Sequence, residues 1–93
     1  MARKKTPNID FIIGMAEDFV NGGDYIGFVL DFTYYFIQKY DKMCKEDEML
    51  ADMINYYLFE RAFDIHKNDS EEDLRKVMKK ALKELKSDDI DIY

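Results

Sequence analysis

The sequence predicts an all-α protein, a compact antiparallel bundle of four helices. Apolar residues recur at helical spacing in four segments, turn-forming or acidic residues separate these segments, and the longest apolar stretch contains no proline. The 93 residues are enough for one domain with a single core. We expect short flexible termini and helices at about residues 8–20, 24–44, 48–66 and 70–86.

The first helix is predicted to follow a short basic arm, residues 1–7. Thr6 before Pro7 is typical of an N-cap and a first helical position, and Asn8 is the alternative cap. Asn21, Gly22 and Gly23 end the helix, because glycine readily adopts the left-handed conformation that follows a helix. The apolar positions between them are Ile9, Ile12, Ile13, Ala16, Phe19 and Val20.

Residues 24–44 are predicted to form the central helix. Its polar residues lie within about 40° of Asp31 on a helical wheel: Asp24, Asp31, Gln38, Lys42 and Lys45. Its apolar face covers about 160° and must be packed against several helices: Ile26, Val29, Leu30, Phe32, Thr33, Phe36, Ile37, Tyr40, Met43 and Cys44. Alternating aromatic residues would also suit a strand, but the stretch is too long for one and contains no turn.

The third helix is predicted to begin after a break at residues 45–48. One uninterrupted helix would place the charge of Asp47 in the buried stripe, which is costly. The wider of its two apolar stripes contains Leu50, Ile54, Tyr57, Leu58, Ala62 and Ile65, with Ala51 beside it. The second stripe, nearly opposite, contains Met49, Tyr56, Phe59 and Phe63. Either the core covers both stripes, or the second one contacts a partner or a second copy of the chain.

The fourth helix has the clearest start. Ser70 to Asp73 resembles a capping box with aspartate in place of the usual glutamate. Acids lie in the first turn and lysines toward the end, which suits the helix dipole. A narrow apolar stripe runs between them: Leu74, Val77, Met78, Ala81, Leu82 and Leu85. We expect the helix to end near residue 86, before an acidic tail at residues 87–93 that is too short to fold alone.

Charge is distributed unevenly along the chain, whose net charge is −6. Residues 8–73 contain sixteen acids and five bases, whereas residues 74–86 contain six bases and one acid. Such an acidic body repels nucleic acid and attracts basic proteins. The single cysteine fits a reducing compartment, the N-terminal apolar run is too interrupted for a signal peptide, and no run approaches the roughly 18 residues of a membrane span. We therefore expect a cytoplasmic protein.

Catalytic and metal chemistry have little support in this sequence. Cys44 and His66 are the only residues of their types, and we expect a buried inert thiol and a surface imidazole. Residue 63 is phenylalanine, so the Glu-x-x-His pair of a di-iron bundle is missing. The glycines match no phosphate-binding loop, and the acids at residues 69–73 lack the glycine of a calcium loop. We predict no enzyme, no metal site and no cofactor.

The aromatic residues favour protein binding instead. The chain contains seven tyrosines and seven phenylalanines, several of them beside acids, and aromatic rings surrounded by polar groups commonly anchor interfaces. We predict a non-enzymatic module that inhibits or regulates a basic protein, such as an immunity protein or antitoxin that acts on a toxin or nuclease-like enzyme. The predicted contacts are Asp31, Tyr34, Tyr35, Asp52, Tyr56, Phe59, Glu60 and Phe63.

Two alternative functions remain open. A nucleic-acid-associated regulator could use the bases of residues 3–5 and those of the last helix, although the acidic body opposes it. The bases of the last helix are Arg75, Lys76, Lys79, Lys80, Lys83 and Lys86, and simple pairing with the acidic body would also explain them. The second alternative is a structural homodimer whose aromatic stripe is its own interface.

Overall fold

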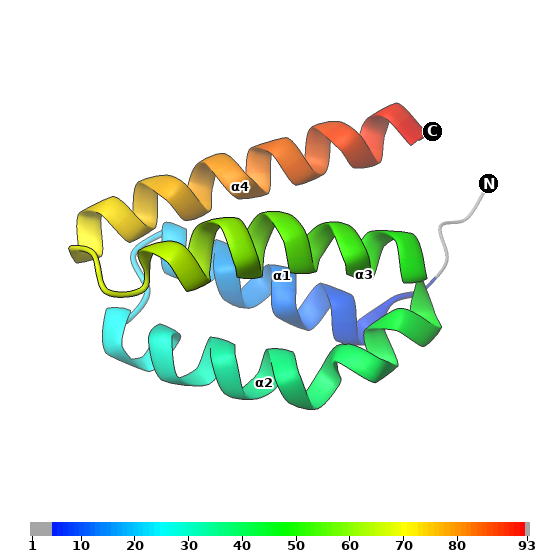
Figure 1. Ribbon diagram of the computed structural model, residues 1–93, viewed down its shortest axis with the longest axis horizontal. Helices are drawn as coiled ribbons and strands as arrows, with labels where there is room; N and C mark the ends of the chain where they lie inside the picture. The colour runs from blue at the N-terminus through cyan, green and yellow to red at the C-terminus, as the bar shows by residue number, and fades with distance from the viewer. Residues whose placement is uncertain (1–4, 93) are drawn as a thin grey trace.

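The computed structural model describes the backbone of residues 5–92 and the side chains of residues 5–86, and shows an antiparallel four-helix bundle (Figure 1). Helix α1 (Pro7–Val20) is followed by α2 (Tyr25–Glu46) and α3 (Glu48–Ile54). The third helix continues without a break into a π-helical segment, η1 (Asn55–Asp64), and α4 (Glu71–Ile92) completes the bundle. The structure is 87% helical, and the part of the chain that it describes contains no strand. The predicted all-α fold is confirmed.

Each helix packs against two neighbours. Helix α2 contacts α1 and α3, while α4 contacts α1 and η1, so that α2 and α4 lie on opposite sides of the bundle (Figure 1). The prediction that residues 24–44 form a central helix is therefore wrong, because α2 occupies a corner. A corner helix leaves its outer side without a neighbour within the chain.

The core is built on a row of phenylalanines along α2. Phe28, Phe32 and Phe36 follow one another at four-residue intervals and are buried. Phe28 stacks on Phe19 of α1 with ring centroids 4.3 Å apart, and Phe36 stacks on Phe59 of η1 at 4.4 Å. Burying these large rings removes more apolar surface from water than burying the aliphatic stripe on the other side of α2.

The aliphatic stripe of α2 faces solvent instead of the core. Ile26, Leu30 and Ile37 were predicted to lie on the buried face, but they are 67%, 66% and 65% exposed. Phe28, which the prediction left out of that face, is buried in their place. Both stripes of the helix are apolar, so the sequence pattern alone did not decide between them.

The π-helical segment changes which residues of the third helix are buried. Its hydrogen bonds join residues five apart, so side chains five residues apart lie on the same face of a π-helix. In an α-helix, side chains seven residues apart lie on the same face. Leu58 and Phe63 are five apart and both are buried, but Ile65, seven after Leu58, is 64% exposed. The same spacing brings Asn55 Nδ2 within 2.8 Å of Glu60 Oε2. The predicted burial of Ile65 is wrong for this reason.

Three predicted helix starts are confirmed by side-chain caps. Asp24 accepts a hydrogen bond from the Gly27 amide at 2.6 Å. Asp47 is the single extended residue between α2 and α3, and it accepts one from the Leu50 amide at 3.1 Å. Ser70 Oγ accepts one from the amide of residue 73 at 3.2 Å. These short polar side chains satisfy backbone N–H groups that have no partner within the helix.

The C-terminal end differs from the prediction. Helix α4 continues past residue 86 to Ile92, so the predicted acidic tail is helical over residues 87–92. This segment contains no glycine or proline that would end a helix. Of the predicted basic arm, residues 1–4 lie outside the described part of the chain, as does residue 93.

A carboxylate from α2 caps the start of α1. Thr6 occupies the predicted N-cap position, but its hydroxyl donates to Asp10 at 3.1 Å instead of capping the helix. Glu46, in the last turn of α2, accepts hydrogen bonds from the amides of Asn8 at 3.0 Å and Ile9 at 3.1 Å. Partial burial acts to raise the pKa of Glu46, but these donors and the nearby charge of Lys39 together hold the pKa below its usual value.

Because the pKa of Glu46 is lowered on folding, its contribution to stability is complete above its ordinary value of 4.5 and is lost as the pH falls through the folded value. We expect Glu46→Gln to lower the free energy of unfolding by about 1 kcal/mol at pH 7. Chemical denaturation at a series of pH values should show this difference shrinking in acid. Asp41→Asn, an exposed carboxylate on the same helix, is the control and should have little effect. A difference that stays constant down to pH 3 would contradict the assigned role.

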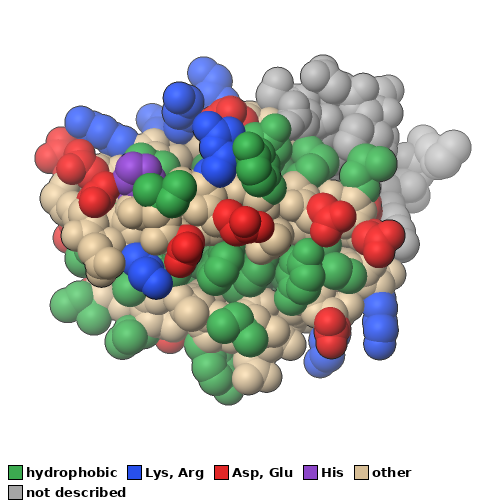
Figure 2. All heavy atoms as spheres, in the orientation of Figure 1, with side chains coloured by type: hydrophobic (Ala, Val, Ile, Leu, Met, Phe, Trp, Pro, Cys, Tyr) green, Lys and Arg blue, Asp and Glu red, His purple; other side chains and the backbone are tan. Residues whose placement is uncertain are grey.

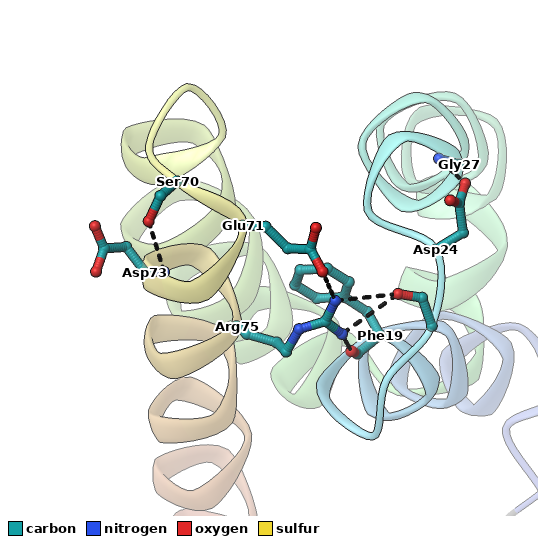
Figure 3. A network of polar contacts seen from close by, with 8 residues as sticks. Phe19, Asp24, Gly27, Ser70, Glu71, Asp73 and Arg75 are labelled. Carbon is teal, nitrogen blue, oxygen red and sulfur yellow. Dashed lines mark hydrogen bonds and ion pairs between the residues drawn. The ribbon is translucent and has the colours of Figure 1, made fainter.

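Arg75 of α4 holds the end of α1 and the loop that follows it (Figure 3). Its guanidinium donates hydrogen bonds to the carbonyl oxygen of Phe19 and, at 3.3 Å, to that of Gly23. It also pairs with Glu71 one turn earlier, and its carbon lies 4.5 Å from the centroid of the Phe19 ring. Arg75 therefore joins α4 to α1, although the sequence placed it on an exposed basic face.

Candidate protein-binding surface

The structure divides the eight predicted contact residues between α2 and the third helix. Asp31, Tyr34 and Tyr35 lie on α2, where the Tyr35 ring meets Phe11 of α1 edge-on at 5.3 Å. Tyr34 in turn meets Tyr35 edge-on at 5.0 Å. Asp31 and Tyr35 therefore lie on the side of α2 that faces α1, and the exposed Tyr34 lies between that side and the outer face of α2. The other five lie on α3 and η1: Asp52, Tyr56, Phe59, Glu60 and Phe63.

Two of those five pack into the bundle. Phe63 is only 1% exposed and lies among the phenylalanines of α2, so the prediction that it contacts a partner is wrong. Phe59 is half-buried, because its ring stacks on Phe36. The π-helical turn rotates both side chains toward the core. Asp52, Tyr56 and Glu60 remain on the surface.

The remaining residues form part of an acidic stripe along the third helix. We define this acidic stripe by its five exposed members, which follow at four-residue intervals: Glu48, Asp52, Tyr56, Glu60 and Asp64. Residues 48–64 contain four acids and only one base. Tyr56 is 51% exposed, and Met49 is also exposed. Figure 2 shows acidic side chains in a row across this face, with hydrophobic side chains gathered beside them.

Neighbouring groups hold the carboxylates of the acidic stripe in place. The Tyr40 hydroxyl donates to Asp52 Oδ1 at 3.1 Å. Burial, together with hydrogen bonds to Asp52 and Cys44, raises the pKa of Tyr40 well above its usual value, so the phenol stays protonated and continues to donate. The side-chain amide of Asn55 donates to Glu60. These contacts reduce the conformational entropy that the two carboxylates would lose on meeting a partner.

The stripe also has two cationic neighbours, Arg61 and Lys67. The guanidinium carbon of Arg61 lies 5.6 Å from the ring centroid of Tyr56 and 5.9 Å from that of Tyr57. It also approaches Glu84 of α4 at 4.0 Å. Arg61 therefore orients the Tyr56 ring and is directed toward α4. Lys67 Nζ lies 3.5 Å from Asp64 Oδ1, at the end of the stripe.

A second acidic feature lies between α1 and α2. A groove of about 330 Å³ is bordered by three aspartates, Asp18, Asp24 and Asp31, and no basic residue lines it. We call it the aspartate groove. Its other lining residues include Phe19 and Phe28, whose rings belong to the core. The predicted contact residue Asp31 lies here, away from the acidic stripe.

The bases of α4 are partly engaged within the chain. Arg75 binds the end of α1, and Lys86 Nζ lies 2.7 Å from Glu17 Oε2 of α1. Lys76 approaches Glu72 at 3.7 Å on its own helix. The exposed basic surface that remains is smaller than the six residues that the sequence suggested: Lys79, Lys80 and Lys83.

The residues that the structure describes provide no group of three His, Cys, Asp or Glu side chains that could hold a metal ion. The half-buried Cys44 lies near the end of α2, whereas His66 follows η1 and its Nδ1 is 2.6 Å from Asp69 Oδ2. Within the same part of the chain, every helix is too short or too polar to span a bilayer.

The exposed aliphatic stripe of α2 is a surface that the sequence analysis missed. The signal was present, since Ile26, Leu30, Thr33 and Ile37 follow at intervals of four, three and four residues. In comparisons with models of known families, with curated proteins and with solved structures, nothing matches this chain. Its residues and their geometry therefore carry the functional argument.

Proposed function

We propose that the protein is a non-enzymatic binding module that docks on a basic protein through the acidic stripe and inhibits or regulates it. The observation that carries this proposal is the exposed tyrosine at the centre of a row of carboxylates on one helix. Carboxylates steer a basic partner and select it, while a tyrosine supplies a large contact area with a polar tip. The two together suit a protein partner better than a small molecule.

The chemistry of the stripe also supports a class of target. Enzymes that act on nucleic acids bind the phosphate backbone with lysine and arginine side chains. A row of carboxylates competes with phosphates for those same side chains. An immunity protein or antitoxin against such an enzyme is therefore the form of inhibitor that we propose.

A basic peptide tests the stripe directly. We expect a synthetic helical peptide of lysine and leucine to shift the amide NMR signals of residues 48–64, with binding that weakens as salt rises. Tyr56→Ala should weaken this binding about tenfold or more, since exposed aromatic anchors dominate such interfaces. Glu60→Lys should weaken it as well and reduce its salt dependence. Both variants should keep the helical circular dichroism signal, because both side chains are exposed.

Matched controls separate the stripe from general acidity. Tyr34→Ala changes a tyrosine that is similarly exposed but lies on α2, and Glu72→Lys changes an exposed glutamate of α4. Both should bind the peptide as the unmodified protein does. Equal weakening by Glu72→Lys, or signal shifts spread over all four helices, would show non-specific attraction and overturn the proposal. Phe59→Ala is unsuitable, because loss of its stacking on Phe36 would also destabilise the fold.

A further inference from the structure

We propose that the outer face of α2 pairs with the same face of a second copy of the chain, with the two α2 helices antiparallel. The face consists of Ile26, Leu30, Thr33 and Ile37, with Tyr34 beside them. The three aliphatic side chains and Tyr34 are each more than half exposed. This inference does not depend on the proposed function, since the acidic stripe lies on a different helix.

The spacing of the face suits a two-fold symmetric pair. Intervals of four, three and four residues bring side chains to one seam between two helices. The same intervals read identically in both directions along the helix. In an antiparallel pair, Ile26 of one copy faces Ile37 of the other, and Leu30 faces Thr33. Every contact then occurs twice, as a two-fold interface requires.

The charges beside the seam favour the antiparallel direction. Asp24 and Asp31 lie in the first half of α2, and Lys42 and Lys45 lie in its last turns. All four occupy one flank of the helix, within about 60° of each other. In an antiparallel pair, this flank meets the same flank of the second copy with the order reversed, so the lysines approach Asp24, while the two copies of Asp31 lie near the two-fold axis. In a parallel pair, this flank would lie opposite the other flank of the second copy, so its lysines and aspartates would not meet.

The aspartate groove is the place where the lysines of the second copy would arrive. When Ile26 faces Ile37, Asp24 lies opposite residue 39 of the other copy, and Lys42 is less than one helical turn further along. Asp18, Asp24 and Asp31 border the groove, and no base of the same chain lines it. A lysine of the second copy would supply the missing positive charge on each side of the interface.

The area of the face indicates how strong the pair is. Three aliphatic side chains that are about two-thirds exposed, together with Tyr34, offer roughly 450 Å² of apolar surface per copy, or about 900 Å² for the pair, and the charged flanks add to this. That total is below the size of a stable specific interface and in the range of weak, transient ones. We therefore expect a dimer with a dissociation constant in the micromolar range, in equilibrium with the monomer.

Sedimentation equilibrium of the full chain between about 1 and 500 µM tests the pairing. The average mass should rise from the monomer value of 11.1 kDa toward twice that value. Ile37→Glu should keep the chain monomeric over the whole range. Ile65→Glu is the matched control, because it changes the same residue type at nearly the same exposure on another helix, and it should dimerise normally. A chain that stays monomeric at 500 µM, or a dimer that Ile37→Glu leaves intact, would overturn the proposal.

A charge exchange tests the direction of the helices. Lys42→Asp should weaken the dimer at least fivefold, and adding Asp18→Lys should restore much of the affinity by placing a base in the groove. Lys83→Asp, an exposed lysine of α4, is the control and should have no effect. If the second substitution weakens the dimer further, lysine and groove do not meet and the antiparallel arrangement is refuted.

Discussion

Replacing Phe63 by alanine is expected to lower the free energy of unfolding by about 3–5 kcal/mol. The same substitution of Ile65 is expected to change it by less than about 0.5 kcal/mol. Phe63 is 1% exposed, and its ring centroid lies 5.0 Å from that of Phe32 and 5.7 Å from that of Phe28. Removing the ring leaves a cavity among aromatic side chains that can only partly relax. Ile65 loses few contacts, since its side chain faces solvent.

The comparison tests the π-helical segment as well as the core. In an uninterrupted α-helix, Ile65 would share the face of Leu58, and Phe63 would point away from it. The two alanine variants would then exchange their effects. Urea denaturation followed by circular dichroism measures both values under one set of conditions. A larger loss for Ile65→Ala than for Phe63→Ala would contradict the π-helical register between residues 55 and 64.

Replacing Arg75 by alanine is expected to cost about 2–3 kcal/mol, an unusually large effect for a residue outside the apolar core. Its guanidinium donates hydrogen bonds to the carbonyl oxygens of Phe19 and Gly23 (Figure 3). The Phe19 carbonyl is at the end of α1, where backbone carbonyl oxygens have no hydrogen-bond partner within the helix. The guanidinium also lies against the Phe19 ring, which adds a cation–π contact. Truncation removes all of these contacts and leaves the carbonyl oxygens partly buried.

Two further variants show which property of Arg75 matters. Arg75→Lys keeps the charge, but an ammonium group lacks the planar fork that donates to two carbonyl oxygens at once. We therefore expect Arg75→Lys to retain less than half of the stability that Arg75→Ala loses. Lys76→Ala removes an exposed neighbour of similar length and should cost less than about 0.5 kcal/mol. Thermal unfolding of the three variants gives the comparison. A fully stable Arg75→Lys protein would show that charge alone is sufficient and would contradict the assigned hydrogen bonds.

Local sequence signals predicted the boundaries of the helices well, because they act between residues close in the chain. Asp24, Asp47 and Ser70 each cap a helix that begins at the next residue, and glycines end α1 as expected. Gly22 has a φ of 112°, a conformation that residues with a side chain rarely adopt. The exception is the end of α4, where the pattern of acids suggested a tail although nothing in the sequence stops the helix.

The candidate site could be predicted only in part from the sequence. Asp52, Tyr56 and Glu60 lie together on one exposed stripe, as their spacing suggested. Phe63 lies outside this stripe. The prediction assumed the α-helical repeat, but the backbone at Phe63 is π-helical and has more residues per turn. Asp31 and Tyr34 lie on another part of the surface, since helical wheels say nothing about which helices are neighbours.

The sequence by itself determined the helical class, the four segments and most of their caps, because these depend on spacing and on the chemistry of adjacent residues. Only the tertiary structure decided which of two apolar stripes on α2 is buried. It also placed Glu46 at the start of α1 and Arg75 at its end, contacts between residues 37 to 56 positions apart. Such choices depend on how large rings and charged groups from different helices fit together, and the pattern of one helix does not contain that information.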